Sequence, residues 1–246
     1  GRVQRSQGRL GAALRTYREG LDLARGSGQP VVATAGTAHL GLAGVLYERD
    51  QLDEALRHAE EGIAPCGQLT STQQLASGMA TLAWIRRATG DSDGAMEAME
   101  EARRVLPDRD VVSLYNPVPA EWARLLLARG DVEEAASWCQ GRGLRETDEV
   151  VYAREPEYLV LARVLLARDA PDRALDLLVR IGAMAERQGR MASVLEAYVL
   201  QARGFHAMGD RSGALGTLAR ALALGYPEGY VRTFADEGPT MASLLG

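Results

Sequence analysis

The chain has 246 residues, of which 46% are hydrophobic and 25% charged, and its formal net charge is −5 at pH 7. That length and apolar content are enough to bury a core, and the acidic balance does not favour free nucleic acid as a partner of this segment. All 28 basic residues are arginine. The chain therefore lacks the lysine of a Walker A loop and is not itself a P-loop NTPase.

A short phrase that ends in alanine recurs six times along the chain. Each phrase starts with Gly or Asp, and successive terminal alanines are 39 to 42 residues apart. In chain order the phrases occupy residues 8–13, 50–55, 90–95, 130–135, 169–174 and 209–214, and they end at Ala13, Ala55, Ala95, Ala135, Ala174 and Ala214. A fixed period of roughly 20 to 50 residues indicates a solenoid, which usually binds along an extended surface.

A second alanine lies twelve residues before the terminal alanine of each of the last five phrases. These alanines are Ala43, Ala83, Ala123, Ala162 and Ala202. Apolar residues recur around them at helical spacing, and no segment alternates long enough to predict a strand. We therefore expect each unit to consist of a helix A, which carries the earlier alanine, and a helix B, which carries the later one. Methyl side chains at these positions would let the two helix axes approach closely.

The first residue of each phrase predicts the end of helix A. A glycine or aspartate there suits a left-handed backbone, which glycine adopts freely and aspartate tolerates at some cost. Acidic residues follow at the start of helix B, where they favour the helix N-terminus. They are Asp53, Asp93, Glu133 and Asp172.

The unbroken period predicts a single helical-repeat domain over residues 1–246. We expect an all-α fold of about six two-helix units, the first of them truncated, which follow a right-handed superhelical path. Breaker clusters should separate the units at residues 26–30, 65–67, 107–110, 141–143 and 188–190. Residues 225–246 should form a C-terminal cap, in which Tyr230, Val231 and Phe234 cover the apolar face of the last unit.

A search for catalytic or metal-binding motifs predicts that the chain is not an enzyme and binds no metal. There is no His-Glu-x-x-His, Cys-x-x-Cys or Gly-x-Ser-x-Gly motif. His39, His58 and His206 are scattered along the chain, and the repeat gives no reason for them to converge. The two cysteines, Cys66 and Cys139, lie in different units, which fits a reducing cytoplasm better than a disulfide.

The two-helix phrases resemble the tetratricopeptide repeat (TPR), although the usual period is about 34 residues. Residues 120–135, 157–168, 173–178 and 221–224, together with the phrase Glu-Gly-Tyr-Val-Arg-Thr-Phe-Ala-Asp-Glu-Gly-Pro at 228–239, resemble a narrower group. They are similar to the repeat region of the large ATP-dependent LuxR-type transcription regulators, the maltose-operon activator family. The resemblance covers nearly the whole chain, and 229–238 is its most specific part.

This resemblance implies a module excised from a larger regulator. A nucleotide-binding domain would precede the segment, so ATP is expected only there and no cofactor within these residues. A helix-turn-helix domain would follow and would make the contact with DNA. The repeats between them would sense an inducer or bind a partner, in the cytoplasm and without a membrane.

In TPR-like arrays helix A lines the concave face, so the residues one and four past each helix A alanine should point into a groove. The candidate ligand-binding residues at these positions are Tyr47, Trp84, Arg87, Arg124, Arg163, Arg203 and His206. Arginine forks suit carboxylates or phosphates, and aromatic rings suit stacking. The arginines could equally pair with acids of a neighbouring repeat, and the aromatic residues could be wedges between repeats.

Two hypotheses for the function follow. The groove could bind a small-molecule inducer, or the array could be a scaffold that docks a polypeptide or another domain of the same regulator. The identity of the inducer cannot be transferred from the resemblance, because inducers differ across the family.

Overall fold

The computed structural model describes residues 1–26, 32–69, 72–106 and 116–246, which are helical and contain no strand. The expected all-α class is confirmed. The helices are α1 (Arg2–Ser6), α2 (Leu10–Gly26), α3 (Val32–Glu48), α4 (Leu52–Leu69), α5 (Thr72–Ala88), α6 (Ser92–Val105), α7 (Val118–Arg129), α8 (Val132–Gly141), α9 (Glu155–Ala167), α10 (Pro171–Arg187), α11 (Met191–Ala207), α12 (Arg211–Gly225), α13 (Arg232–Ala235) and α14 (Pro239–Leu245), with short 3-10 turns at Tyr152–Arg154 and Tyr226–Glu228. None of the described helices is long and apolar enough to cross a lipid bilayer.

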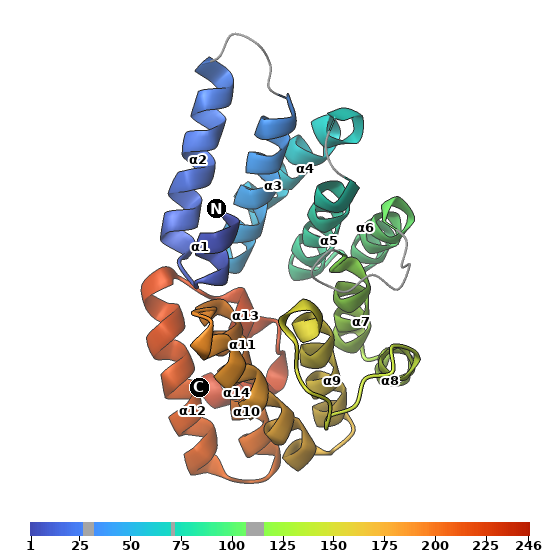
Figure 1. Ribbon diagram of the computed structural model, residues 1–246, viewed down its shortest axis with the longest axis vertical. Coiled ribbons are helices and arrows are strands. Elements are labelled where there is room, and N and C mark those ends of the chain that lie inside the picture. Colours follow the sequence, from blue (N-terminus) through green and yellow to red (C-terminus); the bar gives the residue numbers. More distant parts are fainter. Residues whose placement is uncertain (27–31, 70–71, 107–115) are drawn as a thin grey trace. The chain divides into compact units, whose positions relative to one another are not determined.

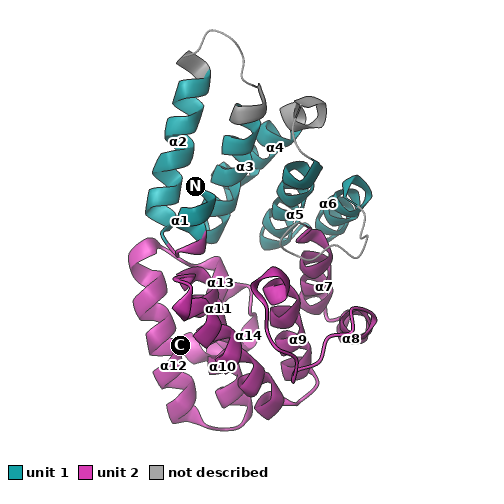
Figure 2. Ribbon diagram, in the orientation of Figure 1, with its two compact units in different colours: residues 1–5, 9–111 teal, residues 6–8, 112–246 magenta. Residues whose placement is uncertain are grey.

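Consecutive helices pair as the two-helix units predict (Figure 1). Helices α3, α5, α7, α9 and α11 are the A helices, and each packs against the B helix that follows it. The chain forms two compact units, unit 1 with residues 1–5 and 9–111 and unit 2 with residues 6–8 and 112–246 (Figure 2). Within each of these two compact units, successive A helices also contact one another. These contacts join α3 to α5 in unit 1, and α7 to α9 and α9 to α11 in unit 2. The single domain expected over 1–246 stays a prediction.

Both alanine ladders lie at the centre of the helix pairs. Every one of the eleven alanines identified from the sequence is at most 1% exposed. Around them the larger apolar side chains of neighbouring helices close the core, such as Leu177, Leu178 and Ile181 on α10, each 0% exposed. The repeat period is therefore the spacing between sites where two helices touch.

All six turn positions adopt the predicted left-handed backbone. The values of φ are 77° at Gly8, 59° at Asp50, 89° at Gly90, 100° at Gly130, 57° at Asp169 and 76° at Gly209. The acids expected after the turn do fall in the first turn of helix B. In two of the two-helix repeats the residue before helix B also caps that helix. The carboxylates of Asp91 and Asp210 accept hydrogen bonds from the amides of Gly94 and Gly213 at 2.9 and 2.8 Å.

The predicted breaks between units have mixed outcomes. Those at 141–143 and 188–190 coincide with the ends of α8 and α10. The predicted break at 65–67 is wrong, because α4 continues to Leu69. Apart from Gly26, the last residue of α2, the clusters at 26–30 and 107–110 lie outside the described residues.

The C-terminal segment folds back on α11. Phe234 on α13 and Met241 on α14 are 5% and 0% exposed, and they join a cluster with side chains of α11 and α12, against which Tyr230 packs. The predicted capping role is thus seen for Tyr230 and Phe234. It is wrong for Val231, which is 40% exposed, because α13 begins only at the next residue and leaves this side chain outside the core.

We predict that Gly130→Ala lowers the free energy of unfolding by about 1–2 kcal/mol, because a Cβ is disfavoured at φ 100°. An added Cβ would meet no neighbouring atom at this site, so the backbone conformation alone is tested. Gly216→Ala on α12, where a Cβ also meets nothing, is the matched control and should be neutral or stabilising by up to about 1 kcal/mol. Urea unfolding measures both, and equal effects would contradict the explanation.

Candidate functional site

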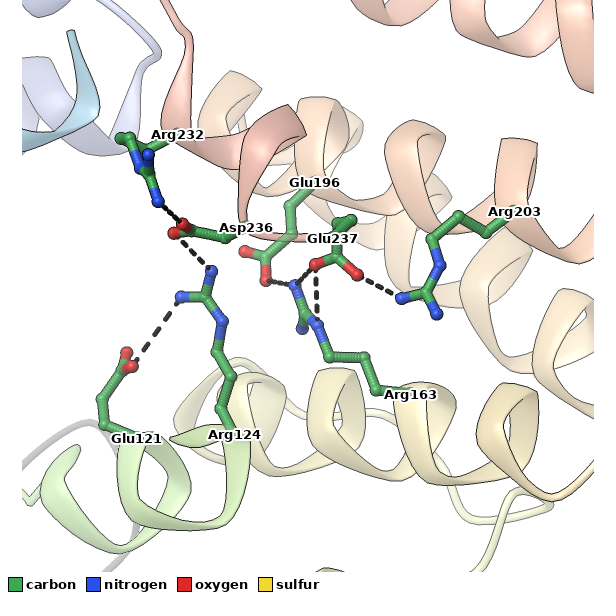
Figure 3. A network of polar contacts seen from close by, with 8 residues as sticks. All are labelled: Glu121, Arg124, Arg163, Glu196, Arg203, Arg232, Asp236 and Glu237. Carbon is green, nitrogen blue, oxygen red and sulfur yellow. Dashed lines mark hydrogen bonds and ion pairs between the residues drawn. The ribbon is translucent and has the colours of Figure 1, made fainter. Parts of the chain in front are cut away.

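The three arginines predicted to face the groove come together in unit 2. Arg124, Arg163 and Arg203 extend from α7, α9 and α11 toward the turn that follows α13 (Figure 3). Two carboxylates of that turn, Asp236 and Glu237, lie among them. The arginine stripe is therefore a real feature of the A helices, and the chain's own C-terminal segment binds it.

Glu237 is the centre of this cluster. Arg163 donates to its Oε1 from Nε at 2.9 Å and from Nη2 at 2.6 Å, and Arg203 pairs with Oε2. The Arg163 Nη2 atom also donates to Glu196 Oε1 at 2.8 Å. The side chains of Arg163 and Glu237 are only 6% and 3% exposed, so this is a buried ion pair with several charge-assisted hydrogen bonds.

Asp236 makes the second set of contacts. Arg124 Nη2 lies 3.5 Å from its Oδ2, and Arg232 of α13 pairs with its Oδ1. Arg124 also lies 3.7 Å from Glu121 on the preceding turn of α7. One dipeptide therefore connects three successive A helices to the cap.

The charges around Glu237 decide its ionisation. Burial raises the pKa of this carboxyl, but the guanidinium groups of Arg163, Arg203 and Arg124 outweigh that effect and lower the pKa to about 2. Burial lowers the pKa of the Arg163 guanidinium, but the carboxylates of Glu237 and then Glu196 outweigh that effect and raise the pKa. Arg163 and Glu237 are thus both ionised at neutral pH.

The observed ion pairs match in part the alternative interpretation of the stripe, in which the arginines pair with acidic residues of a neighbouring repeat. Arg163 pairs with Glu196 of the next repeat, as an inter-repeat ion pair would. All three arginines also pair with a carboxylate of the cap, and Arg124 pairs in addition with Glu121 of its own helix. A ligand that bound these arginines would have to compete with Asp236 and Glu237. Ligand contact by the stripe stays a prediction.

The other predicted groove residues lie elsewhere. Tyr47 and Trp84 are buried in unit 1 at 8% and 4% exposure. Arg87 lies over the Trp84 ring, with its guanidinium carbon 5.6 Å from the ring centroid. His206 is exposed at the end of α11. None of these four lines the cavity described next.

A cavity of about 220 Å³ opens in unit 1 between α1, α2 and the A helices α3 and α5. Most of the residues that line it carry polar side chains, among them two arginines but no acidic residue, although apolar atoms form much of its wall. The lining residues are Arg2, Arg5, Tyr17, Thr37, Leu40, Gly41, Gln73, Gln74, Ser77, Gly78 and Thr81.

Hydrogen bonds already order part of this lining. Thr37 on α3 donates to Gln74 Oε1 on α5 at 3.0 Å, and Thr81 donates to the Ser77 carbonyl at 3.0 Å. The amide groups of the glutamines and the hydroxyl oxygens offer both donors and acceptors to a small molecule. The arginines add positive charge at one side, so the cavity suits a polar molecule that carries hydroxyl or anionic groups.

Glycine lets Tyr17 form one wall of the cavity. A Cβ at position 41 would lie 2.3 Å from the Tyr17 ring, so α3 can approach α2 only without a side chain there. Burial raises the pKa of the Tyr17 phenol against the opposing effects of Arg5 and Arg2. The phenol therefore stays protonated at neutral pH and can donate a hydrogen bond.

The expectation that the histidines do not converge is wrong for two of them. His39 on α3 and His58 on α4 face each other, with 2.8 Å between their Nδ1 atoms, because the two positions lie on the facing sides of one helical hairpin. Burial, followed by the proximity of His39, lowers the pKa of His58. His206 belongs to unit 2.

Neither the cavity nor the pair of histidines in unit 1 was predicted from the sequence. The cavity is lined by residues two and six positions before the helix A alanine, Gly41 and Thr37 on α3 and Thr81 and Ser77 on α5. The signal was present, since small and hydroxylated residues occupy both offsets in two consecutive units.

Comparison with known proteins identifies the repeat. The profile of the MalT-like TPR region matches residues 1–246. No curated protein matches the chain. The crystal structure of BtubC (BKLC) from P. vanneervenii is 19% identical, with a TM-score of 0.53 over 91% of this chain and 92% of that chain. Two structures of a putative kinesin light chain with nearly identical TPR-like repeats from Podosopora anserina are 23% and 24% identical, with TM-scores of 0.46 and 0.45 over 77% of this chain and 94% of theirs. The similarity to BtubC shows the fold alone.

We predict that Glu237→Gln lowers the free energy of unfolding by about 3 kcal/mol at pH 7, because it leaves buried guanidinium groups without their carboxylate. The effect should depend on pH. The folded pKa of about 2 lies below the ordinary 4.5, so the folded chain binds fewer protons, and the stabilisation is present above the unfolded pKa and lost as the pH falls from there toward 2.

Urea unfolding between pH 7 and pH 3 measures this dependence. The difference between the wild-type chain and Glu237→Gln should shrink as the pH falls. Glu186→Gln, at an exposed carboxylate on α10, is the control and should have little effect. A difference that stays constant over the whole range would contradict the assignment.

Proposed function

Because the chain belongs to the family of MalT-like TPR regions, which are repeat modules of MalT-type regulators, we propose that it senses a small polar inducer. The observation that carries the proposal is the polar cavity of unit 1, which lies between the A helices α3 and α5. The site differs from the arginine stripe in that no carboxylate lines it.

The chemistry of the lining defines the class of inducer. Two arginines and no carboxylate line the cavity, so a cationic molecule is disfavoured and an anionic or polyhydroxylated one is favoured. Threonine and serine hydroxyls and glutamine amides bind hydroxyl groups through paired donor and acceptor contacts. A volume near 220 Å³ restricts the buried part of the ligand to a compact group.

Binding there would favour one packing of the A helices. The lining residues come from four helices, and a ligand that contacts all of them stabilises the arrangement in which they surround it. A ligand shifts a conformational equilibrium by as much as its affinities for the two states differ. In the full-length regulator this shift would act on a flanking ATP-binding domain and a helix-turn-helix domain, which alone would contact DNA, in the cytoplasm.

A second candidate function is the docking of a polypeptide or of another domain of the same regulator. One observation favours it: the A helices of unit 2 already bind an acidic stretch of chain through Arg124, Arg163 and Arg203. An acidic segment of a partner could make the same contacts in its place. No small molecule would then be needed.

Thermal-shift screening against sugars, sugar phosphates and carboxylates tests the first proposal. We predict that at least one raises the melting temperature, because a ligand that binds only the folded chain stabilises it. Thr81→Val should weaken that binding roughly fivefold, since a net hydrogen bond contributes about 1 kcal/mol. Arg5→Gln should weaken an anionic ligand further, and Arg211→Gln, at an exposed position of α12, is its control.

Two outcomes would reject the sensing proposal. One is that no compound raises the melting temperature while a flanking domain does. The other is that a compound binds equally well to the wild-type chain, Thr81→Val and Arg5→Gln, which would place its site outside the cavity. The first outcome favours the docking function, which a pull-down with the flanking domains then tests in each nucleotide state.

A further inference from the structure

Three possible metal ligands converge on the hairpin of α3 and α4 in unit 1. His39 Nδ1 lies 2.8 Å from His58 Nδ1 and 3.1 Å from Glu61 Oε2. His58 Nδ1 lies 3.8 Å from the same Glu61 oxygen. The arrangement is unrelated to the cavity, whose lining includes none of the three residues.

The three atoms compete for the hydrogens that lie between them. A neutral imidazole nitrogen carries either a hydrogen or a lone pair, and the carboxylate oxygen carries only lone pairs. If His39 Nδ1 holds the hydrogen, that single hydrogen must serve both the His58 nitrogen and the Glu61 oxygen. A divalent cation would accept all three lone pairs at once.

We propose that His39, His58 and Glu61 form a binding site for a divalent transition-metal ion, with Zn²⁺ as the expected occupant. Two imidazoles and one carboxylate are a ligand set that Zn²⁺ accepts, whereas Mg²⁺ and Ca²⁺ require oxygen ligands. Atoms that each lie about 2.1 Å from one ion are roughly 3–3.5 Å apart. The separations of 2.8, 3.1 and 3.8 Å lie around that range, so side-chain rotations suffice to admit the ion.

The surroundings have the features of a metal site. The side chains of His39 and His58 are 13% and 10% exposed, and that of Glu61 is 44% exposed, which gives the ion a path from solvent. Glu54 Oε1 lies 3.8 Å from the other ring nitrogen of His58, Nε2. A carboxylate at that nitrogen favours the tautomer with hydrogen on Nε2 and leaves Nδ1 free to bind a metal.

Another repeat packs the same two positions without histidine. His39 lies four residues before Ala43, and His58 lies three residues after Ala55. In the repeat of α9 and α10 the same offsets hold Tyr158 and Leu177, which are 2% and 0% exposed in an apolar cluster. The helix pair can therefore pack there without a histidine, and the residue types vary among the repeats, since Tyr198 and Thr217 occupy these offsets in α11 and α12.

Bound to both helices, the ion would join α3 to α4 across their interface. Such a link stabilises the hairpin by the binding free energy of the ion, because the separated helices cannot supply all three ligands. The proposal assigns the metal a structural role and stands whether or not the cavity binds an inducer.

Cobalt titration of the whole chain after EDTA treatment tests the site. We expect one Co²⁺ per chain, visible d–d absorption that Zn²⁺ abolishes by displacement, and no competition from Mg²⁺. His58→Gln and Glu61→Gln should each weaken binding by about 10-fold or more, since even the loss of an outer partner of a metal ligand costs that much. Zn²⁺ should raise the melting temperature of the wild-type chain more than that of His58→Gln or Glu61→Gln.

Two matched controls separate the site from adventitious binding. Glu60→Gln, at the exposed neighbour of Glu61, and His206→Gln, at the exposed histidine of α11, should bind Co²⁺ as the wild-type chain does. Because Glu61 is partly exposed, Glu61→Gln should fold even if His58→Gln does not, which circular dichroism checks. An unchanged cobalt spectrum in Glu61→Gln would overturn the proposal, as would the absence of any cobalt spectrum in the wild-type chain.

Discussion

The contact of two helices at a pair of alanines is the constraint on which the other features depend. A methyl group at each contact lets the helix axes approach closely, and in each of the last five repeats both alanines are buried. The left-handed residue before helix B turns the chain back within a few residues. Together these two conditions fix the register, so that a side chain at a given offset from the alanine recurs on the same face of every A helix.

Two different uses of that face follow from the register. In unit 2 the offset one past the alanine holds arginine on three successive A helices, and a single acidic dipeptide at 236–237 can reach all three. In unit 1 the corresponding residues are Gly44 and Trp84, and the polar lining of a cavity comes from offsets nearer the start of the helix. The phrase 228–239, which carries the most specific resemblance to the regulator family, is also the segment that supplies the two carboxylates and the buried ring of Phe234.

The sequence predicted the helices, the alanine crossings and the turns because each of these depends on local chemistry that repeats. It placed Arg124, Arg163 and Arg203 on one face correctly, yet their partners could not be found, since Asp236 and Glu237 are distant in sequence and belong to no repeat. Residues one and four positions after the helix A alanine lie on average about 70° from it around the helix axis. Residues two and six positions before the alanine, which line the cavity, lie on average about 140° from it. The cavity therefore opens on a part of the A helix about 70° away from the face that carries Tyr47 and Trp84, both of which are buried. The meeting of His39 and His58 required the facing sides of α3 and α4, which the period alone does not specify.

The central claim is that a small polar molecule binds between α3 and α5 in unit 1. Amide hydrogen exchange of the full-length regulator, with and without the compound that most raises its melting temperature, tests this claim most directly. The account predicts slower exchange in residues 37–41 and 73–81, which include the cavity lining of these helices, with smaller changes in α8 and α10. Protection confined to unit 2, or equal protection throughout the chain, would contradict it.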